Sequence, residues 1–118
     1  IVESVEAGTN LEAVKSEYTD ILAHPGILKI EEAELAAKND IFIEVSSRSG
    51  HSLANGIVVK TGREAGVKFL INSDSHCWSD LFSRGMQEKV AIGAGLEKDE
   101  IGEIFNKNYS DFFKKIDY

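Results

Sequence analysis

The amino-acid sequence predicts an α/β fold. Three short apolar segments, "DILAH", "IFIEVS" and "VKFLIN", have the length and composition of buried strands. Segments rich in strong helix formers separate them, so the chain is expected to form β-α-β units with parallel strands and right-handed crossovers. Three strands cannot close a barrel, which usually takes about eight strand and helix pairs. The sequence therefore predicts either a small open sheet or part of a barrel.

The elements follow one another without a linker, a repeat or a low-complexity tract, so residues 1–118 are expected to form a single domain. Thr9 and Glu12 match a capping box at the start of the first helix, and Gly66 stands just past the end of the third. The expected order is a helix over 10–18, a strand over 20–24, a helix over 30–39, a strand over 41–46, a helix over 51–66, a strand from 67, and two or three short helices between 86 and 116. Leu11, Val14 and Tyr18 recur at helical spacing in the first helix, and Leu53, Ile57, Val58 and Ala65 are expected to face inward in the third.

The charge balance and the apolar segments argue against two classes of partner. The 20 acidic and 13 basic residues give a net charge of -7, and no Lys/Arg cluster interrupts it, so most of the surface would repel nucleic acid. The longest apolar segments are too short to span a bilayer, and the first residues lack the pattern of a signal peptide. The single cysteine, Cys77, excludes an internal disulfide and fits a reducing compartment. We therefore expect a cytoplasmic protein without a nucleic-acid or membrane partner.

Polar side chains gather at the C-terminal ends of the three predicted strands. Ligands of parallel α/β folds bind at this end, both in open sheets and in barrels. Because successive strand residues point to opposite faces, each strand is expected to present its polar groups on one face. The residues that would share a face are Leu22 and His24 in the first strand, Phe42, Glu44 and Ser46 in the second, and Leu70, Asn72, Asp74 and His76 in the third.

Glu44 needs a partner, because an unpaired carboxylate buried within "IFIEVS" would cost several kcal/mol. A cation, a basic side chain or water would satisfy it. A purely structural interpretation stays open, in which Glu44 pairs with Arg48, His24 is a turn residue and Asp74 caps a helix. One shared site accounts for all three strand ends together.

The polar residue types favour a metal site. Imidazole and carboxylate groups suit zinc, iron or manganese, and His24, Asp74 and His76 would supply three ligands. Hydroxide generated on such a metal attacks carbonyl or phosphoryl centres. The sequence shows no nucleophile elbow, phosphate-binding glycine loop or Cys-x-x-Cys pair that would favour another chemistry. Metal-assisted hydrolysis is therefore the leading hypothesis.

Four segments together resemble the C-terminal half of the PHP (polymerase and histidinol phosphatase) family. They are "DILAHPG", "FIEVSSRSGHSLANG", "FLINSDSHCWSD" and "AGLEKDEIGEIFNKN", in this order. The resemblance implies part of a distorted (β/α)₇ barrel that binds divalent metals and hydrolyses phosphate esters. It also implies that His24, Asp74 and His76 are metal ligands and that Glu44 is an acid beside the site.

The segment around Arg48, His51 and Asn55 resembles a histidinol-phosphatase-related branch of that family. This resemblance implies that Arg48, His51 and Asn55 bind a small phosphorylated substrate, with a histidinol-phosphate-like compound as one candidate, and that Glu44, Arg48 and His51 take part in catalysis. An arginine suits such a place because its planar fork matches two phosphate oxygens. The alternative for Arg48 is a surface base paired with a nearby acid.

The chain departs from the family pattern in one respect. PHP domains begin with an H-x-H strand in their N-terminal half, and this chain lacks that strand. We therefore expect a partial barrel without its N-terminal half, with exposed strand edges through which copies could associate. The parent protein is expected to be a phosphoesterase, and the 118-residue chain alone to be weakly active or inactive.

Three other functions stay open at this point. One is a non-catalytic PHP-type module. The second is an amidohydrolase-like metalloenzyme that cleaves C–N bonds, although that superfamily typically ends its ligand set on a lone strand aspartate. The third is a small binding domain that folds without metal.

Overall fold

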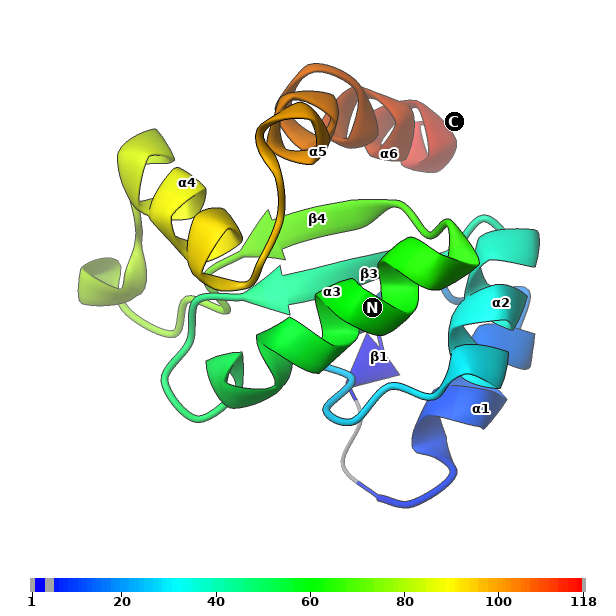
Figure 1. Ribbon diagram of the computed structural model, residues 1–118. Helices are drawn as coiled ribbons and strands as arrows, with labels where there is room; N and C mark the ends of the chain where they lie inside the picture. Colours follow the sequence, from blue (N-terminus) through cyan, green and yellow to red (C-terminus); the bar gives the residue numbers. More distant parts are fainter. Residues whose placement is uncertain (1, 4–5, 118) are drawn as a thin grey trace.

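The structure is a computed structural model that describes residues 2, 3 and 6–117. Its centre is a parallel sheet of four strands in the order β1-β2-β3-β4 (Figure 1). The strands are β1 (Val2–Glu3), β2 (Ile21–Ala23), β3 (Phe42–Ser46) and β4 (Phe69–Asn72). The α/β class and the three predicted strands are confirmed, whereas β1, at two residues, gave no strand signal of its own. The described strands form an open sheet, so they do not by themselves establish the predicted barrel.

Helices follow the strands in the predicted order, although α1 ends three residues earlier than predicted and the start of the third predicted helix is the 3₁₀ turn η1. They are α1 (Thr9–Lys15), α2 (Ile30–Lys38), α3 (Asn55–Ala65), α4 (Arg84–Gly93), α5 (Lys98–Glu103) and α6 (Tyr109–Ile116), together with the 3₁₀ turns η1 (Ser52–Ala54) and η2 (Trp78–Asp80) and the π turn η3 (Ile104–Asn108). The capping box predicted for α1 is wrong, because Gly8 is the N-cap and Thr9 is already helical. Gly66 ends α3 in the left-handed region, as predicted.

The main core lies between the helices and one face of the sheet. Its buried members include Leu22, Ile43 and Ile71 from the strands and Val14 and Val58 from α1 and α3. Leu53, predicted to face inward, lies instead in η1 at 91% exposure, and Tyr18, predicted in the first helix, lies beyond the end of α1 at 85% exposure.

The opposite face of the sheet carries a second, smaller core. Ile21, Phe42 and Leu70 pack there against Tyr109 and Phe112. Because Leu22 pairs with Ile43 in the sheet, it points to the main core and not to the face of Phe42 and Glu44. The predicted face for Leu22 is therefore wrong. The prediction assumed that strand alternation continues from Leu22 to His24, but His24 lies beyond the end of β2.

The outer edge of β4 is covered by side chains from the C-terminal segment. Asn108 Nδ2 donates to the carbonyl oxygen of Phe69 at 3.0 Å, and the Tyr109 hydroxyl bonds both the N–H and the carbonyl of Ile71. Burial raises the pKa of Tyr109, so its phenol keeps the donated proton at neutral pH. Figure 1 shows α5 and α6 beyond β4, where they close this side of the sheet.

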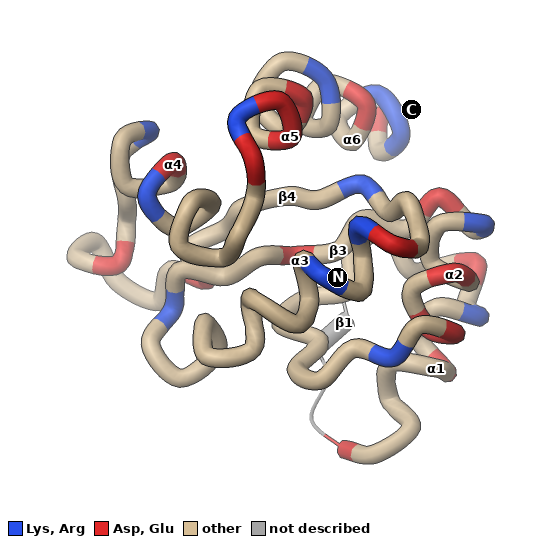
Figure 2. Tube along the Cα trace, viewed as in Figure 1, with Lys and Arg blue, Asp and Glu red and all other residues tan. Residues whose placement is uncertain are grey.

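Charged residues of both signs are spread over the outer helices (Figure 2). Within the strands, Glu44 stands out as a carboxylate in the middle of β3 with 4% exposure. Among the described residues, no helix has the length and apolar character required to cross a membrane.

Candidate functional site

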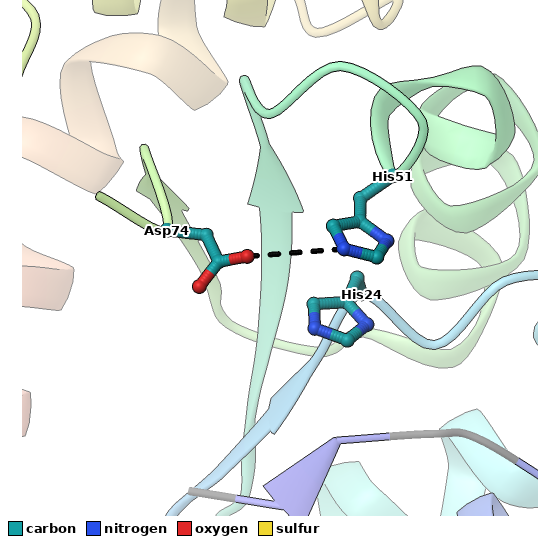
Figure 3. Close-up of side chains that lie close together, drawn as sticks. All are labelled: His24, His51 and Asp74. Carbon is teal, nitrogen blue, oxygen red and sulfur yellow. Dashed lines mark ion pairs between the residues drawn. The ribbon is translucent and has the colours of Figure 1, made fainter. Parts of the chain in front are cut away.

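Two histidines and an aspartate from three separate loops meet at the carboxyl ends of the strands (Figure 3). His24 follows β2, His51 precedes η1, and Asp74 follows β4. One potential ligand atom from each residue lies within 4.8 Å of the other two. The rings of His24 and His51 stack with centroids 4.0 Å apart, and His51 Nε2 is 3.8 Å from Asp74 Oδ2. Tetrahedral zinc sites place ligand atoms roughly 3.3 Å apart, so modest side-chain movements would suffice to enclose a cation.

The backbone is strained at two of these three residues. His24 has φ 29° and Asp74 has φ 49°, a region that residues other than glycine seldom adopt. Each such residue costs on the order of 1 kcal/mol and persists only where its surroundings enforce it. Because the chain is not extended at either position, strand alternation does not decide where their side chains point. The turns, and not the strands, bring His24 and Asp74 together.

Glu44 fixes the first of these turns. Its Oε2 accepts a hydrogen bond of 2.8 Å from the backbone N–H of His24. The structural alternative that paired Glu44 with Arg48 is therefore not what the structure shows, because the contact recorded for the carboxylate is to His24. Glu44 acts on the site through the position that it gives to His24.

Arg48 lies between two carboxylates. Its Nε is 3.5 Å from Asp74 Oδ2, and its Nη1 donates to the Asp74 carbonyl at 2.8 Å and approaches Asp80 Oδ2 at 3.4 Å. The pairing of Arg48 with nearby acids, which was one of the two interpretations of this residue, is thus present. The same Asp74 oxygen faces both His51 and Arg48, so Arg48 borders the three-residue group directly.

His76 lies at the margin of the group and is not one of its three members. Its side chain is 63% exposed, and Nδ1 is 3.9 Å from Asp74 Oδ1. The same Nδ1 is 2.7 Å from the Asp74 carbonyl and 2.8 Å from Arg48 Nη1. A ring nitrogen cannot donate to the carbonyl and accept from Arg48 in one tautomer, so only one of these bonds forms at a time. Metal binding by His76 stays a prediction.

Asp80 is a structural residue of the site that sequence reasoning missed. Its Oδ2 accepts the backbone N–H groups of His76 at 2.8 Å and Cys77 at 3.2 Å. The His76 bond is the main reason why the pKa of Asp80 lies below its ordinary value. The capping function that one interpretation assigned to Asp74 belongs to Asp80. The signal available was an acid three residues after the start of a short turn, the spacing of a capping box.

Asn55 holds the end of β3. Its Oδ1 accepts from the Ser46 N–H at 3.2 Å, and its Nδ2 donates to the Ser46 carbonyl at 2.7 Å. The side chain is buried, with 8% exposure. This geometry gives Asn55 a positioning task and leaves little of its amide for a substrate.

Comparison with known proteins relates the chain to proteins named as phosphatases. Two proteins named probable phosphatase, from Thermoanaerobacter sp. and Thermoanaerobacter pseudethanolicus, are each 34% identical over an alignment of 120 positions, gaps included, that spans 86% of this chain and 49% of theirs. An uncharacterized protein of Methanocaldococcus jannaschii is 44% identical over 116 residues, or 98% of this chain and 53% of that protein. The chain thus spans about half the length of these relatives. No protein-family model and no solved structure matches it. The chain is therefore similar, over most of its length, to part of proteins named probable phosphatases.

Proposed function

We propose that this chain forms part of a metal-dependent phosphoesterase of the PHP type. The observation that carries the proposal is the convergence of His24, His51 and Asp74 at the carboxyl ends of parallel strands. The similarity to proteins named probable phosphatases supports phosphate esters as substrates. The whole protein's substrate is proposed to be a small phosphate monoester, with a histidinol-phosphate-like compound as one candidate.

The donor set fits a divalent cation. Two imidazoles and one carboxylate are the ligands of catalytic zinc, iron and manganese sites, which leave a position open. His24, His51 and Asp74 would hold the ion, with His76 close enough to Asp74 to join them after a side-chain rotation. A divalent cation supplies Lewis acidity toward a phosphate ester and makes a nearby water more acidic.

Glu44 would then orient a metal ligand, and Arg48 would neutralise charge on the phosphate. Glu44 holds the His24 backbone through the 2.8 Å bond, which fixes the direction of that imidazole. Arg48 contributes a planar guanidinium whose in-plane N–H donors match pairs of phosphate oxygens. In the structure, these donors point to Asp74 and Asp80, so a bound phosphate would take over some of their hydrogen bonds.

The sheet supports the barrel part of the proposal. Its strands follow in sequential order without the reversal that marks doubly wound folds. The main core also lies on one face, between the sheet and α1 to α4, as in a β/α barrel whose helices form an outer ring.

The test measures metal content and phosphate ester hydrolysis together. The full natural protein and the 118-residue chain would be purified, and each compared with its Asp74→Asn variant. Asp111→Asn on α6 is the matched control, because that aspartate pairs with Lys107 and Lys68 away from the three-residue group. Mass spectrometry would measure bound metal, and p-nitrophenyl phosphate would report hydrolysis.

Near-stoichiometric zinc, iron or manganese and phosphatase turnover in the full protein are expected, with both lost in Asp74→Asn and kept in Asp111→Asn. The 118-residue chain is expected to turn over weakly or not at all. Equal metal content and equal melting in all variants would instead favour a binding domain that folds without metal. Hydrolysis of amides but not of phosphate esters would favour the amidohydrolase-like alternative.

A further inference from the structure

A cleft of about 420 Å³ opens beside Arg48, and its lining includes none of His24, His51 and Asp74. The loops that follow β3 and β4 form one part of its wall, and the start of α4 forms the other. Its volume lies within the range of small-molecule sites, roughly 300 to 1,000 Å³. Arg48 and Asp80 line both this cleft and the site described above, and Arg48 also contacts Asp74.

Four serines from the loops after β3 and β4 line the cleft. Ser47 and Ser49 flank Arg48, and Ser73 and Ser79 come from the loop after β4. Within the described part of the chain, the hydroxyls of Ser47 and Ser49 make no hydrogen bond. A hydroxyl both donates and accepts, so such a wall matches a ligand whose own polar groups are hydroxyls.

Apolar side chains line the cleft as well. Phe82, Met86 and Val90 are among them, and Met86 is 47% exposed. A sugar or similar polyol has this same division, because its hydroxyls point outward from a ring or chain with apolar C–H faces. The charge in the cleft is nearly balanced, with Arg48 and Asp80 as its ionised lining groups, so a polyanion such as nucleic acid would find little attraction.

We infer that this cleft is the subsite for the organic half of the substrate and that the substrate class is the phosphate monoester of a small polyol, such as a sugar phosphate. The inference rests on the proposed phosphoesterase function. The phosphate group would lie at the boundary formed by Arg48 and Asp74, and the polyol would extend between the serine wall and α4. Phe82, Met86 and Val90 are then the residues that determine specificity.

The experiment fills the cleft and measures selectivity. In the full natural protein loaded with manganese, Met86→Trp would place an indole in the cleft, while Ile92→Trp puts the same group on α4 outside it, at a position that is 65% exposed. Values of kcat/KM would be measured for glucose 6-phosphate, phenyl phosphate and methyl phosphate. Calorimetry would measure binding of glucose 6-phosphate and of inorganic phosphate.

The unsubstituted protein is expected to prefer glucose 6-phosphate to both other esters. Met86→Trp should lower the kcat/KM ratio of glucose 6-phosphate to methyl phosphate by about tenfold or more, since pockets discriminate ligand size by this order. Ile92→Trp should leave the ratio unchanged. An unchanged ratio in Met86→Trp, or a preference for phenyl phosphate, would overturn the inference while the phosphoesterase function stands.

The binding data separate the two proposals if no ester is hydrolysed. In that case the phosphoesterase function fails. Glucose 6-phosphate that binds more tightly than inorganic phosphate, and loses this advantage in Met86→Trp, would still establish the subsite. Equal binding of the two ligands would remove the subsite as well.

Discussion

Removal of the Glu44 side chain should weaken the proposed metal binding, because Glu44 positions the proposed ligand His24. Glu44 is 4% exposed and accepts one charge-assisted hydrogen bond, from the His24 N–H at 2.8 Å. Glu44→Ala leaves that N–H without its acceptor, which costs about 1.5 to 3 kcal/mol, and the cavity adds to this. Relief from burying a charge offsets part of the sum. The expected loss is therefore about 2 to 4 kcal/mol of unfolding free energy.

Glu44→Ala should also lower the affinity for metal, an effect that is measured separately from the loss of folding stability. Residues that orient a ligand are worth about 10- to 100-fold in metal affinity, so Glu44→Ala should weaken zinc binding by that order. Glu32→Ala is the matched control: Glu32 is also buried, at 7% exposure, and accepts from the Lys29 N–H and from Asn10, but on α2 outside the metal group. It should lose comparable stability and keep its zinc affinity.

Two measurements check this prediction. Urea denaturation followed by far-ultraviolet circular dichroism gives the free energy of unfolding, and calorimetric titration with zinc gives the affinity under conditions where each variant is folded. Glu44→Gln keeps the shape and an acceptor oxygen, so it should retain most of the affinity. Equal zinc affinities in Glu44→Ala and Glu32→Ala would refute the positioning of His24 by Glu44.

Three further predictions concern the scaffold. Tyr109→Phe removes the hydroxyl that bonds the Ile71 backbone and should cost about 1 to 3 kcal/mol, with faster amide hydrogen exchange at Ile71 as the specific sign. Gly62→Ala would place a Cβ 2.6 Å from the nearest side-chain carbon, so we expect a loss of about 1 to 3 kcal/mol in thermal unfolding, and an unchanged melting temperature would contradict this packing. The hydrogen bond from Arg63 lowers the pKa of Glu100, so this pair stabilises the fold above the unfolded glutamate pKa of about 4.3, and its contribution is lost as the pH falls through the folded pKa. Glu100→Gln should therefore lower the urea midpoint at pH 7 and have much less effect in strong acid, where the natural carboxyl is neutral as well, and an equal difference at about pH 2 would rule the ion pair out as its cause.

The sequence allowed the strands and the end of the sheet that carries the site to be predicted. The apolar segments around Ile43 and Ile71 are too short and too continuous for amphipathic helices, and parallel strands direct their carboxyl ends to one edge. The polar residues after them could be placed at that edge without any knowledge of their side-chain directions.

The composition of the site could not be predicted in the same way. Alternation holds only where the chain is extended, and His24 and Asp74 both have positive φ values. His51 joins the group because the loop before η1 folds its ring against His24, a contact between residues 27 positions apart that no local spacing encodes. For the same reason His76, at ligand spacing from Asp74 in the sequence, points largely to solvent.

The covered edge of β4 makes the two edges of the described sheet unlike each other. Edge-to-edge polymerisation needs a free edge at both ends of each molecule, so that one copy can follow another without limit. Here Asn108 and Tyr109 already occupy backbone groups of Phe69 and Ile71 on the β4 side. Among the described strands, β1 is the other edge, so two copies that paired through it would form a closed two-fold dimer with no edge left to recruit a third. These two side chains would thus limit strand addition at the β4 edge.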